Sequence, residues 1–180
     1  MAKLLNATST VALWHDVIYQ AENLCEVSLP QEVESYLVFL MIRYTATPDI
    51  VNHVMATDLL KGLQSGSGER EVKLQGVGDK CLIFSGLFPQ QAEQRLVKIS
   101  YFVNLGQSSY ATLSREHNDL YWRLAHQFVL LMDVLQSLRQ TSDKYPDLLP
   151  LQAYEQWSET GSQRAYTILK EYTRHKPWKQ

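Results

Sequence analysis

Apolar residues recur along most of the chain at intervals of three and four, the spacing of a helix with one buried face. The first stripe follows Ser9 and Thr10, either of which can cap a helix, and consists of Val11, Trp14, Ile18, Ala21 and Cys25. Residues 28–31, SLPQ, predict the start of the next helix, because they have the spacing of a capping box with proline in the first turn. Residues 32–46 carry so few polar side chains that we expect this second helix to lie at the centre of the fold.

The middle of the chain contains one clear signal and one ambiguous signal. Thr47, Pro48 and Asp49 are typical of a helix start, and the apolar spacing continues to residue 63. The glycine- and serine-rich residues 64–70 predict a flexible loop. Residues 71–76 alternate apolar and charged side chains as a short strand does, whereas the residues after them follow helical spacing. We favour a helix, because the sequence contains no second strand signal to pair with.

The pattern of the C-terminal half predicts helices throughout. A short helix starts at Pro89, another covers residues 100–113, and the longest covers residues 115–140, with Ser114 as its cap. The last helix spans residues 151–173 and contains Gly161, which costs about 1 kcal/mol relative to alanine inside a helix. The sequence therefore predicts an all-α fold, a single-domain bundle of about seven or eight helices covering residues 1–180.

Charge and hydropathy exclude some classes of partner and of membrane attachment. The net charge is −2, so no overall basic field would hold a nucleic-acid backbone, and we do not expect nucleic acid as a partner. The tail, residues 174–180, is basic, and the sequence leaves open whether it binds an anionic surface or only complements a helix dipole. No run approaches the roughly 18 apolar residues of a membrane span. Both cysteines lie in apolar stretches without a secretory signal before them, which predicts a cytoplasmic protein with reduced thiols.

Residues with catalytic or metal-binding chemistry are scattered. The sequence has no HExxH and no Cys-x-x-Cys motif, and Cys81 falls on an apolar helical stripe, which favours a structural thiol. Asp49 and His53 stand four residues apart and are the weak candidates for a metal site. A metal-dependent enzyme would have to bring these two together with His15 or His126. We therefore expect no catalytic residue, no cofactor and no functional metal site.

The glycines predict close packing rather than phosphate binding. Gly76, Gly78, Gly86 and Gly106 fit neither a P-loop nor a dinucleotide fingerprint. We expect them where another helix crosses closely, so that Gly86→Leu destabilises the fold by about 1–3 kcal/mol through overpacking.

Tyrosine is the last compositional signal, with ten in the chain. Buried tyrosines need partners for their hydroxyls, so a polar ligand pocket inside the bundle is one interpretation and an interface rich in tyrosine is the other. The candidates for lining such a pocket fall on or beside apolar stripes: Tyr36, Tyr44, Tyr101, Tyr110 and Tyr121.

Three segments carry a resemblance to a known family. They are GDKCLIFSGLFPQQAEQRLVKISYFVNLGQSSYATL (78–113), LPQEVESYLVFLMIRY (29–44) and FVLLMDVLQSLRQ (128–140), and together they resemble a family of uncharacterised bacterial proteins. The resemblance implies a soluble bacterial protein whose signature centres on residues 76–113. It implies no catalytic residues, because the family has no known function.

Taken together, these patterns favour a non-enzymatic helical interaction or regulatory protein. Its expected partner is a second copy of itself, as a dimer, or another protein bound through an aromatic-rich face. The alternative is a bundle that binds a small or lipid-like ligand in a cavity of more than roughly 300 Å³.

Overall fold

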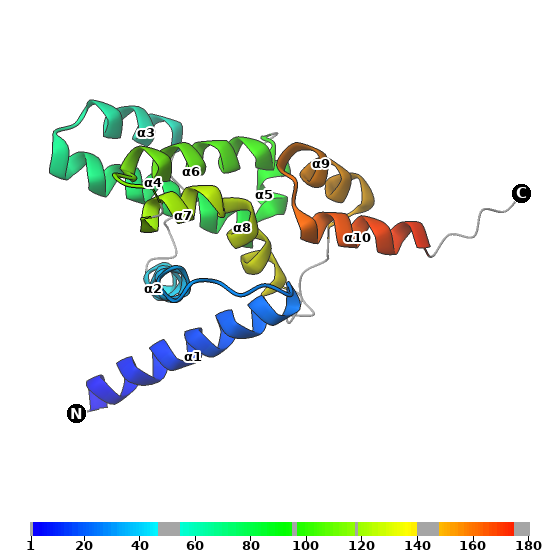
Figure 1. The fold of residues 1–180 in the computed structure, drawn as a ribbon, viewed down its shortest axis with the longest axis horizontal. Coiled ribbons are helices and arrows are strands. Elements are labelled where there is room, and N and C mark those ends of the chain that lie inside the picture. The colour runs from blue at the N-terminus through cyan, green and yellow to red at the C-terminus, as the bar shows by residue number, and fades with distance from the viewer. Residues whose placement is uncertain (1, 47–54, 95–96, 118, 140–147, 175–180) are drawn as a thin grey trace, which may run out of the picture.

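The structure is a computed structural model that describes residues 2–46, 55–94, 97–117, 119–139 and 148–174. Within these ranges every regular element is a helix, so the predicted all-α bundle is confirmed (Figure 1). The helices are α1 (Ala2–Leu24), α2 (Gln31–Ala46), α3 (Met55–Gln64), α4 (Ser67–Leu87), α5 (Pro89–Gln94), α6 (Ile99–Leu113), α7 (Leu120–His126), α8 (Phe128–Ser137), α9 (Pro150–Thr160) and α10 (Gln163–Arg174).

The described residues contain ten helices, and this exceeds the predicted number because two long helices are broken. The expected helix at 115–140 begins only at α7, where Asp119 and not Ser114 is the cap and accepts from the Trp122 backbone N–H at 2.7 Å. It then breaks at Gln127. The expected helix at 151–173 breaks at Gly161, whose φ of +76° ends α9 in the left-handed conformation that glycine adopts without steric cost.

The segment around residue 70 also differs from the prediction. Residues 67–70, expected in a flexible loop, form the first turn of α4, and only Ser65 and Gly66 separate α3 from α4. Residues 71–76 are helical, which decides between the strand and the helix. A short connection of this kind is sufficient because α3 packs back against α4 as an antiparallel neighbour.

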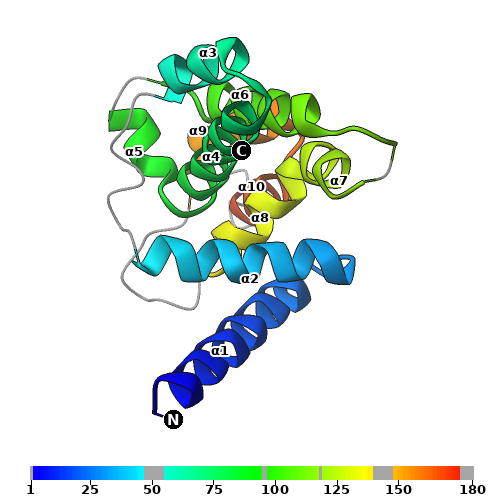
Figure 2. The same ribbon diagram turned by 90° about the vertical axis from the view of Figure 1, so that its left-hand side faces the viewer.

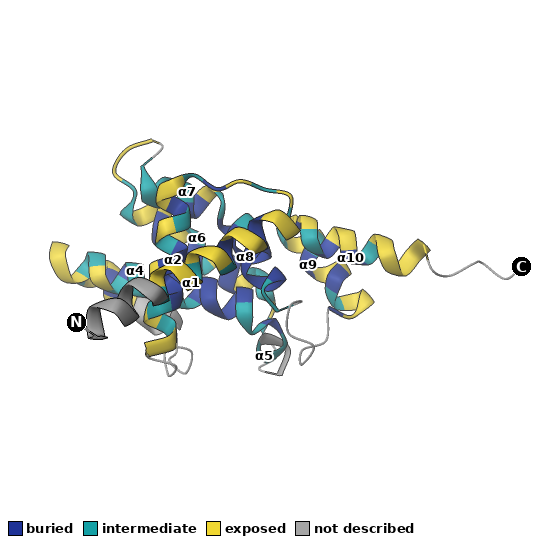
Figure 3. Cartoon of the chain, turned by 90° about the horizontal axis from the view of Figure 1, so that it is seen from below, coloured by how far each residue is buried: buried dark blue, intermediate teal, exposed yellow. Residues whose placement is uncertain are grey.

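The centre of the bundle is α4, not α2 as the sequence suggested. Helix α4 packs against α3, α6 and α8 and is buried over nearly every residue from Val77 to Gly86. Helix α2 buries one face only, and Phe39 on its other face is 55% exposed. Figure 3 shows the buried positions gathered on α4, α6 and α8. The number of apolar residues in a helix does not show whether the helix is central, because a helix with one exposed face can also carry apolar side chains in solvent.

Three of the four glycines expected at close helix contacts lie at such contacts. A Cβ at Gly86 would stand 2.6 Å from the Leu135 Cβ, and one at Gly106 would overlap the Phe128 ring. A Cβ at Gly78 would overlap the Tyr110 ring. The prediction is wrong for Gly76, where a Cβ would meet nothing within 4 Å. Helix α4 can therefore approach α6 and α8 closely because glycine stands at the crossing points.

The α9–α10 hairpin stands apart from the main core, whereas α1 joins that core through Ile18 and Ala21. Helices α9 and α10 form a hairpin with its own small cluster of buried residues, Leu148, Ala153, Ala165 and Ile168. Helix α1 packs against α2 and α8, while its N-terminal half runs away from the other helices in both ribbon views (Figures 1 and 2). Among the described residues, no helix is long and apolar enough to cross a bilayer.

Candidate functional site

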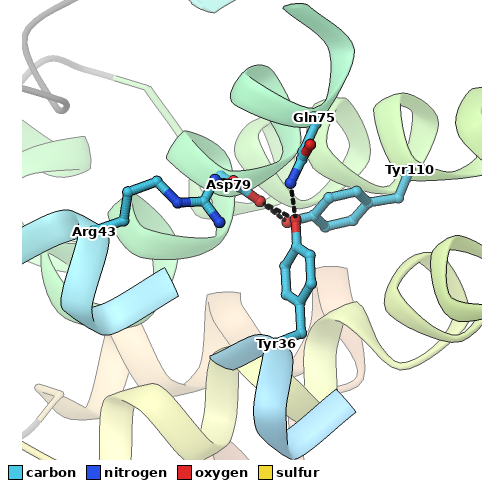
Figure 4. A network of polar contacts seen from close by, with 5 residues as sticks. All are labelled: Tyr36, Arg43, Gln75, Asp79 and Tyr110. Atoms are coloured by element: carbon cyan, nitrogen blue, oxygen red, sulfur yellow. Dashed lines mark hydrogen bonds and ion pairs between the residues drawn. The ribbon is translucent and has the colours of Figure 1, made fainter. Parts of the chain in front are cut away.

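Three helices meet at the carboxylate of Asp79, in the middle of α4 (Figure 4). Its Oδ1 accepts hydrogen bonds from the hydroxyls of Tyr36 in α2, at 2.5 Å, and of Tyr110 in α6, at 2.7 Å. Its Oδ2 accepts from Arg43 Nη1 at 2.9 Å. We call these residues, together with Gln75, the Asp79 cluster; Gln75 Nε2 donates to the Tyr36 hydroxyl at 3.3 Å.

Helical spacing places these side chains together. Tyr36 and Arg43 are two turns apart in α2 and so point to the same side, towards α4. Gln75 stands one turn before Asp79 on α4. The Tyr110 ring lies across α4 and reaches the carboxylate because Gly78 has no side chain to occupy that space.

The Asp79 side chain is 2% exposed, and this burial dominates its electrostatics. Loss of hydration raises the pKa of Asp79 above its ordinary value, and the two tyrosine hydroxyls and the Arg43 guanidinium offset that effect only in part. Burial also raises the pKa of Tyr36 and Tyr110, and the neighbouring Asp79 charge raises both further. The two hydroxyls therefore stay protonated and remain donors across the neutral pH range.

The cluster acts chemically as a cross-link between α2, α4 and α6. The donors to Asp79 come from α2 and α6, and each carboxylate oxygen accepts at least one hydrogen bond. A charged acceptor with three donors stabilises more than a neutral pair, and the loss of one partner leaves buried polar groups unsatisfied. The Arg43 side chain is 47% exposed, so the cluster extends from the core to the surface.

The predicted pocket tyrosines separate into two groups. Tyr36 and Tyr121 both pack against Tyr110, with ring centroids 6.2 Å apart in each pair, so three candidates lie together. Tyr44 packs on Phe88, and Tyr101 packs on Phe102 at the edge of the bundle with 43% of its surface exposed. Two of these three, Tyr36 and Tyr110, bond to a carboxylate of the protein itself, and Tyr121 packs behind Tyr110.

The candidate catalytic and metal-binding residues have separate partners where the structure describes them. His15 Nε2 lies 3.0 Å from Glu34 Oε1, and His126 stacks on the Trp122 ring. Asp49 and His53 lie outside the described residues. Across the part of the chain that the structure describes, no three histidine, cysteine or acidic side chains are close enough to hold a metal ion.

Both cysteines are free thiols. Cys81 is completely buried on α4, as its apolar stripe predicted, and burial raises its pKa. Cys25 is partly exposed at the end of α1, and burial raises its pKa as well.

A second buried carboxylate, Asp133 in α8, was not predicted as important. Its Oδ1 accepts from the Ser162 hydroxyl at 2.5 Å, and its Oδ2 accepts from the backbone N–H of Gln163 at 3.0 Å and of Arg164 at 3.3 Å. Ser162 Oγ in turn accepts from the Ala165 N–H and so caps α10. The signal that could have located this site was Gly161 followed by Ser162, a helix stop followed by a cap.

Two of the cavities that the described residues form open on the surface of the bundle, and neither is lined by the predicted tyrosines. One of about 280 Å³ lies between the start of α6 and α9, where Lys98 and Ser100 both bond to Glu159. The other, of about 420 Å³, lies between the C-terminal end of α1, α8 and the first turns of α10.

No protein-family model matches the chain, and no curated protein and no solved structure matches it significantly. The resemblance of residues 78–113 to uncharacterised bacterial proteins therefore stays a prediction. Within that segment, the structure assigns Gly78, Asp79, Gly106 and Tyr110 to packing and to the Asp79 cluster.

Proposed function

We propose that the protein is a non-enzymatic helical interaction protein that self-associates through the N-terminal half of α1. The observation that carries the proposal is the exposure of apolar side chains where this helix leaves the bundle. Leu13 is 61% exposed and Val11 is 37% exposed, and Ala12 between them is exposed too.

The sequence of this half of α1 supports pairing with an identical copy. Residues 4–14, LLNATSTVALW, contain no charged side chain. A helix needs either tertiary packing or a polar surface to be stable in water, and the polar side chains of this segment are limited to serine, threonine and asparagine. In a two-fold symmetric dimer the same face packs on itself, and an uncharged face can do so without like-charge repulsion.

The rest of the molecule holds α1 in position for such a contact. Ile18 and Ala21 in the C-terminal half of α1 are fully buried against the bundle, and His15 pairs with Glu34 on α2. Helix α2 is tied to α4 and α6 through the Asp79 cluster. The N-terminal half of α1 therefore extends from a fixed base, which lowers the entropy cost of association.

Sedimentation velocity over a range of protein concentrations tests this proposal. We expect wild type to form a dimer in the micromolar range and Leu13→Glu to remain a monomer, because a carboxylate at this position opposes burial in the pair. Leu151→Glu is the matched control, since Leu151 in α9 is 69% exposed but lies far along the chain from α1. A wild-type monomer at high micromolar concentration would overturn the proposal, as would a dimer that Leu13→Glu leaves intact.

A further inference from the structure

The cavity of about 420 Å³ between α1, α8 and α10 has the size of a small-molecule site. Four of the residues that line it are apolar: Leu24, Val27, Leu130 and Ile168. None of its lining residues belongs to the Asp79 cluster or to the N-terminal half of α1. The cavity is therefore separate from both features, and its own lining has to indicate what it could hold.

Negative charge predominates among the residues that line this cavity. The acidic ones are Glu26, Asp133 and Glu171, and the basic one is Arg164. Burial raises the pKa of Asp133, so this carboxyl holds a proton more readily than the two exposed glutamates do. Even with a proton on Asp133, two carboxylates are set against one guanidinium. The electrostatic field in the cavity therefore attracts a cation and opposes an anion.

The positive charge of Arg164 is directed towards groups of the protein. Its Nη1 donates to the Gln136 side-chain oxygen at 3.4 Å, and its charge favours the ionised form of Asp133. A cationic ligand at the glutamates therefore meets a guanidinium whose charge is already partly compensated by the protein.

The two helix ends at the cavity reinforce this preference for a cation. The positive N-terminal end of α10 is compensated by Asp133, whose Oδ2 accepts from the backbone N–H of Gln163 at 3.0 Å and of Arg164 at 3.3 Å. The negative C-terminal end of α1 has no basic residue in its last turn. A positive group near the end of α1 would complement this helix dipole.

Glu26 stands at this end of α1, exposed and lining the cavity. Its φ is +54°, and no other non-glycine residue in the described ranges has a positive φ. Glycine adopts this conformation without steric cost, and a helix dipole disfavours an acidic side chain near a helix C-terminus. Local backbone preference therefore does not account for a glutamate at this position, whereas a cation bound beside it would.

We propose that this cavity binds a small organic cation with an apolar body. The ammonium group of the ligand pairs with Glu26 at the rim, in the field of Glu171, and its apolar body lies against Val27, Leu130 and Ile168. The site is independent of self-association through α1. Leu13→Glu should therefore bind the cation as wild type does, and either proposal can fail without the other.

An NMR titration of the full-length chain tests the site with two probes of matched shape. The charged probe is 4-phenylbutylamine, which is protonated at neutral pH, and the uncharged probe is 4-phenylbutan-1-ol. We expect the amine to bind saturably at millimolar concentration and to shift the backbone amide signals of residues 24–27 and 163–168. The alcohol should bind about fivefold more weakly, because an exposed ion pair contributes modestly. Added sodium chloride should weaken binding of the amine only.

Two variants of Glu26 separate ligand binding from a role in the fold. Glu26→Gln should weaken binding of the amine about fivefold and leave the alcohol unchanged. Glu26→Gly should weaken binding of the amine equally and raise the melting temperature, because glycine relieves the left-handed backbone. Glu116→Gln is the matched control and should change neither probe, since Glu116 is exposed and does not line the cavity.

Three results of the titration would overturn the proposal: amine binding that does not saturate, equal binding of amine and alcohol, or wild-type binding of the amine by Glu26→Gln. Amide shifts centred on residues 97–100 and 152–159 would overturn it as well, because they would place the amine at the smaller cavity between α6 and α9.

Discussion

The ring of Tyr110 occupies the space that a side chain on Gly78 would need. A Cβ built on Gly78 would lie 2.7 Å from Tyr110 Cδ1 and 2.8 Å from Cζ, well inside van der Waals contact. The ring cannot turn aside without loss, since its hydroxyl donates to Asp79, the next residue in α4, at 2.7 Å. One glycine thus determines how closely α6 approaches α4 and whether the Asp79 cluster can form.

Gly78→Ala should therefore destabilise the protein. We expect the free energy of unfolding to fall by about 1–3 kcal/mol, because a methyl group must displace the Tyr110 ring from a packed core. Urea unfolding followed by circular dichroism measures this change. Gly76→Ala is the matched control, two residues earlier in the same helix with nothing within 4 Å of its Cβ. It should stabilise by about 0.4–1 kcal/mol because alanine favours the helix. Equal effects at the two positions would contradict the close contact.

Gly86→Leu should lower the melting temperature. Its Cβ would stand 2.6 Å from the Leu135 Cβ, and no rotamer of Leu135 moves that atom, so α8 itself must shift away from α4. We expect a loss of about 1–3 kcal/mol or more from overpacking. Gly68→Leu provides the control, since it lies in the first turn of α4 with open space around it. A melting temperature that stays at the wild-type value in Gly86→Leu would refute this contact.

Asp79 predicts a specific dependence of stability on pH. In the folded protein the pKa of Asp79 is raised above its ordinary value of 3.8. The stabilisation that Asp79 gives the folded state is therefore complete below pH 3.8, and it is lost as the pH rises through the folded pKa. The free energy of unfolding of wild type, minus that of Asp79→Asn, should therefore decrease as the pH rises from 3.8. The contributions of the other carboxylates cancel in this difference. An increase with pH would mean that the three donors outweigh burial.

Asp133→Ala should loosen the α9–α10 hairpin while the main core stays folded. The substitution removes the acceptor of the Ser162 hydroxyl and of two backbone N–H groups at the start of α10. We expect amide hydrogen exchange in residues 163–168 to accelerate by at least about tenfold, and exchange in the centre of α4 to change much less. Glu159→Ala is the control, because it removes an exposed attachment of α9 to Lys98 and Ser100. Uniform acceleration across the chain would instead indicate a single cooperative unit.

Periodicity predicted the buried positions in part, because burial follows the helical repeat only where another helix covers that face. Ile18 and Ala21 of the first stripe are fully buried, as is Cys81 on α4, whereas Val11 of the first stripe is 37% exposed. Helix ends were harder to predict. Gly161 was predicted inside a helix because residues at helical spacing continue past it on one face, whereas its left-handed backbone ends α9.

The candidate site was predicted only in part, since its residues are far apart along the chain. The tyrosine pattern singled out Tyr36 and Tyr110, but they are 43 and 31 residues from the carboxylate that they share. Asp79 could have been noticed as an acidic residue between Val77 and Cys81 on an apolar helical stripe, a position that requires partners. A single sequence does not identify those partners, because they depend on how α2 and α6 pack against α4.

The central place of α4 also has a consequence for how the chain folds. Its contacts with α3 and α6 join neighbours along the sequence, and such contacts close with little loss of chain entropy. Docking of α8 onto α4 and α1 is the distant step. Helices α3, α4 and α6 are therefore suited to act as an early folding nucleus, with α8 and the α9–α10 hairpin joining it after the transition state.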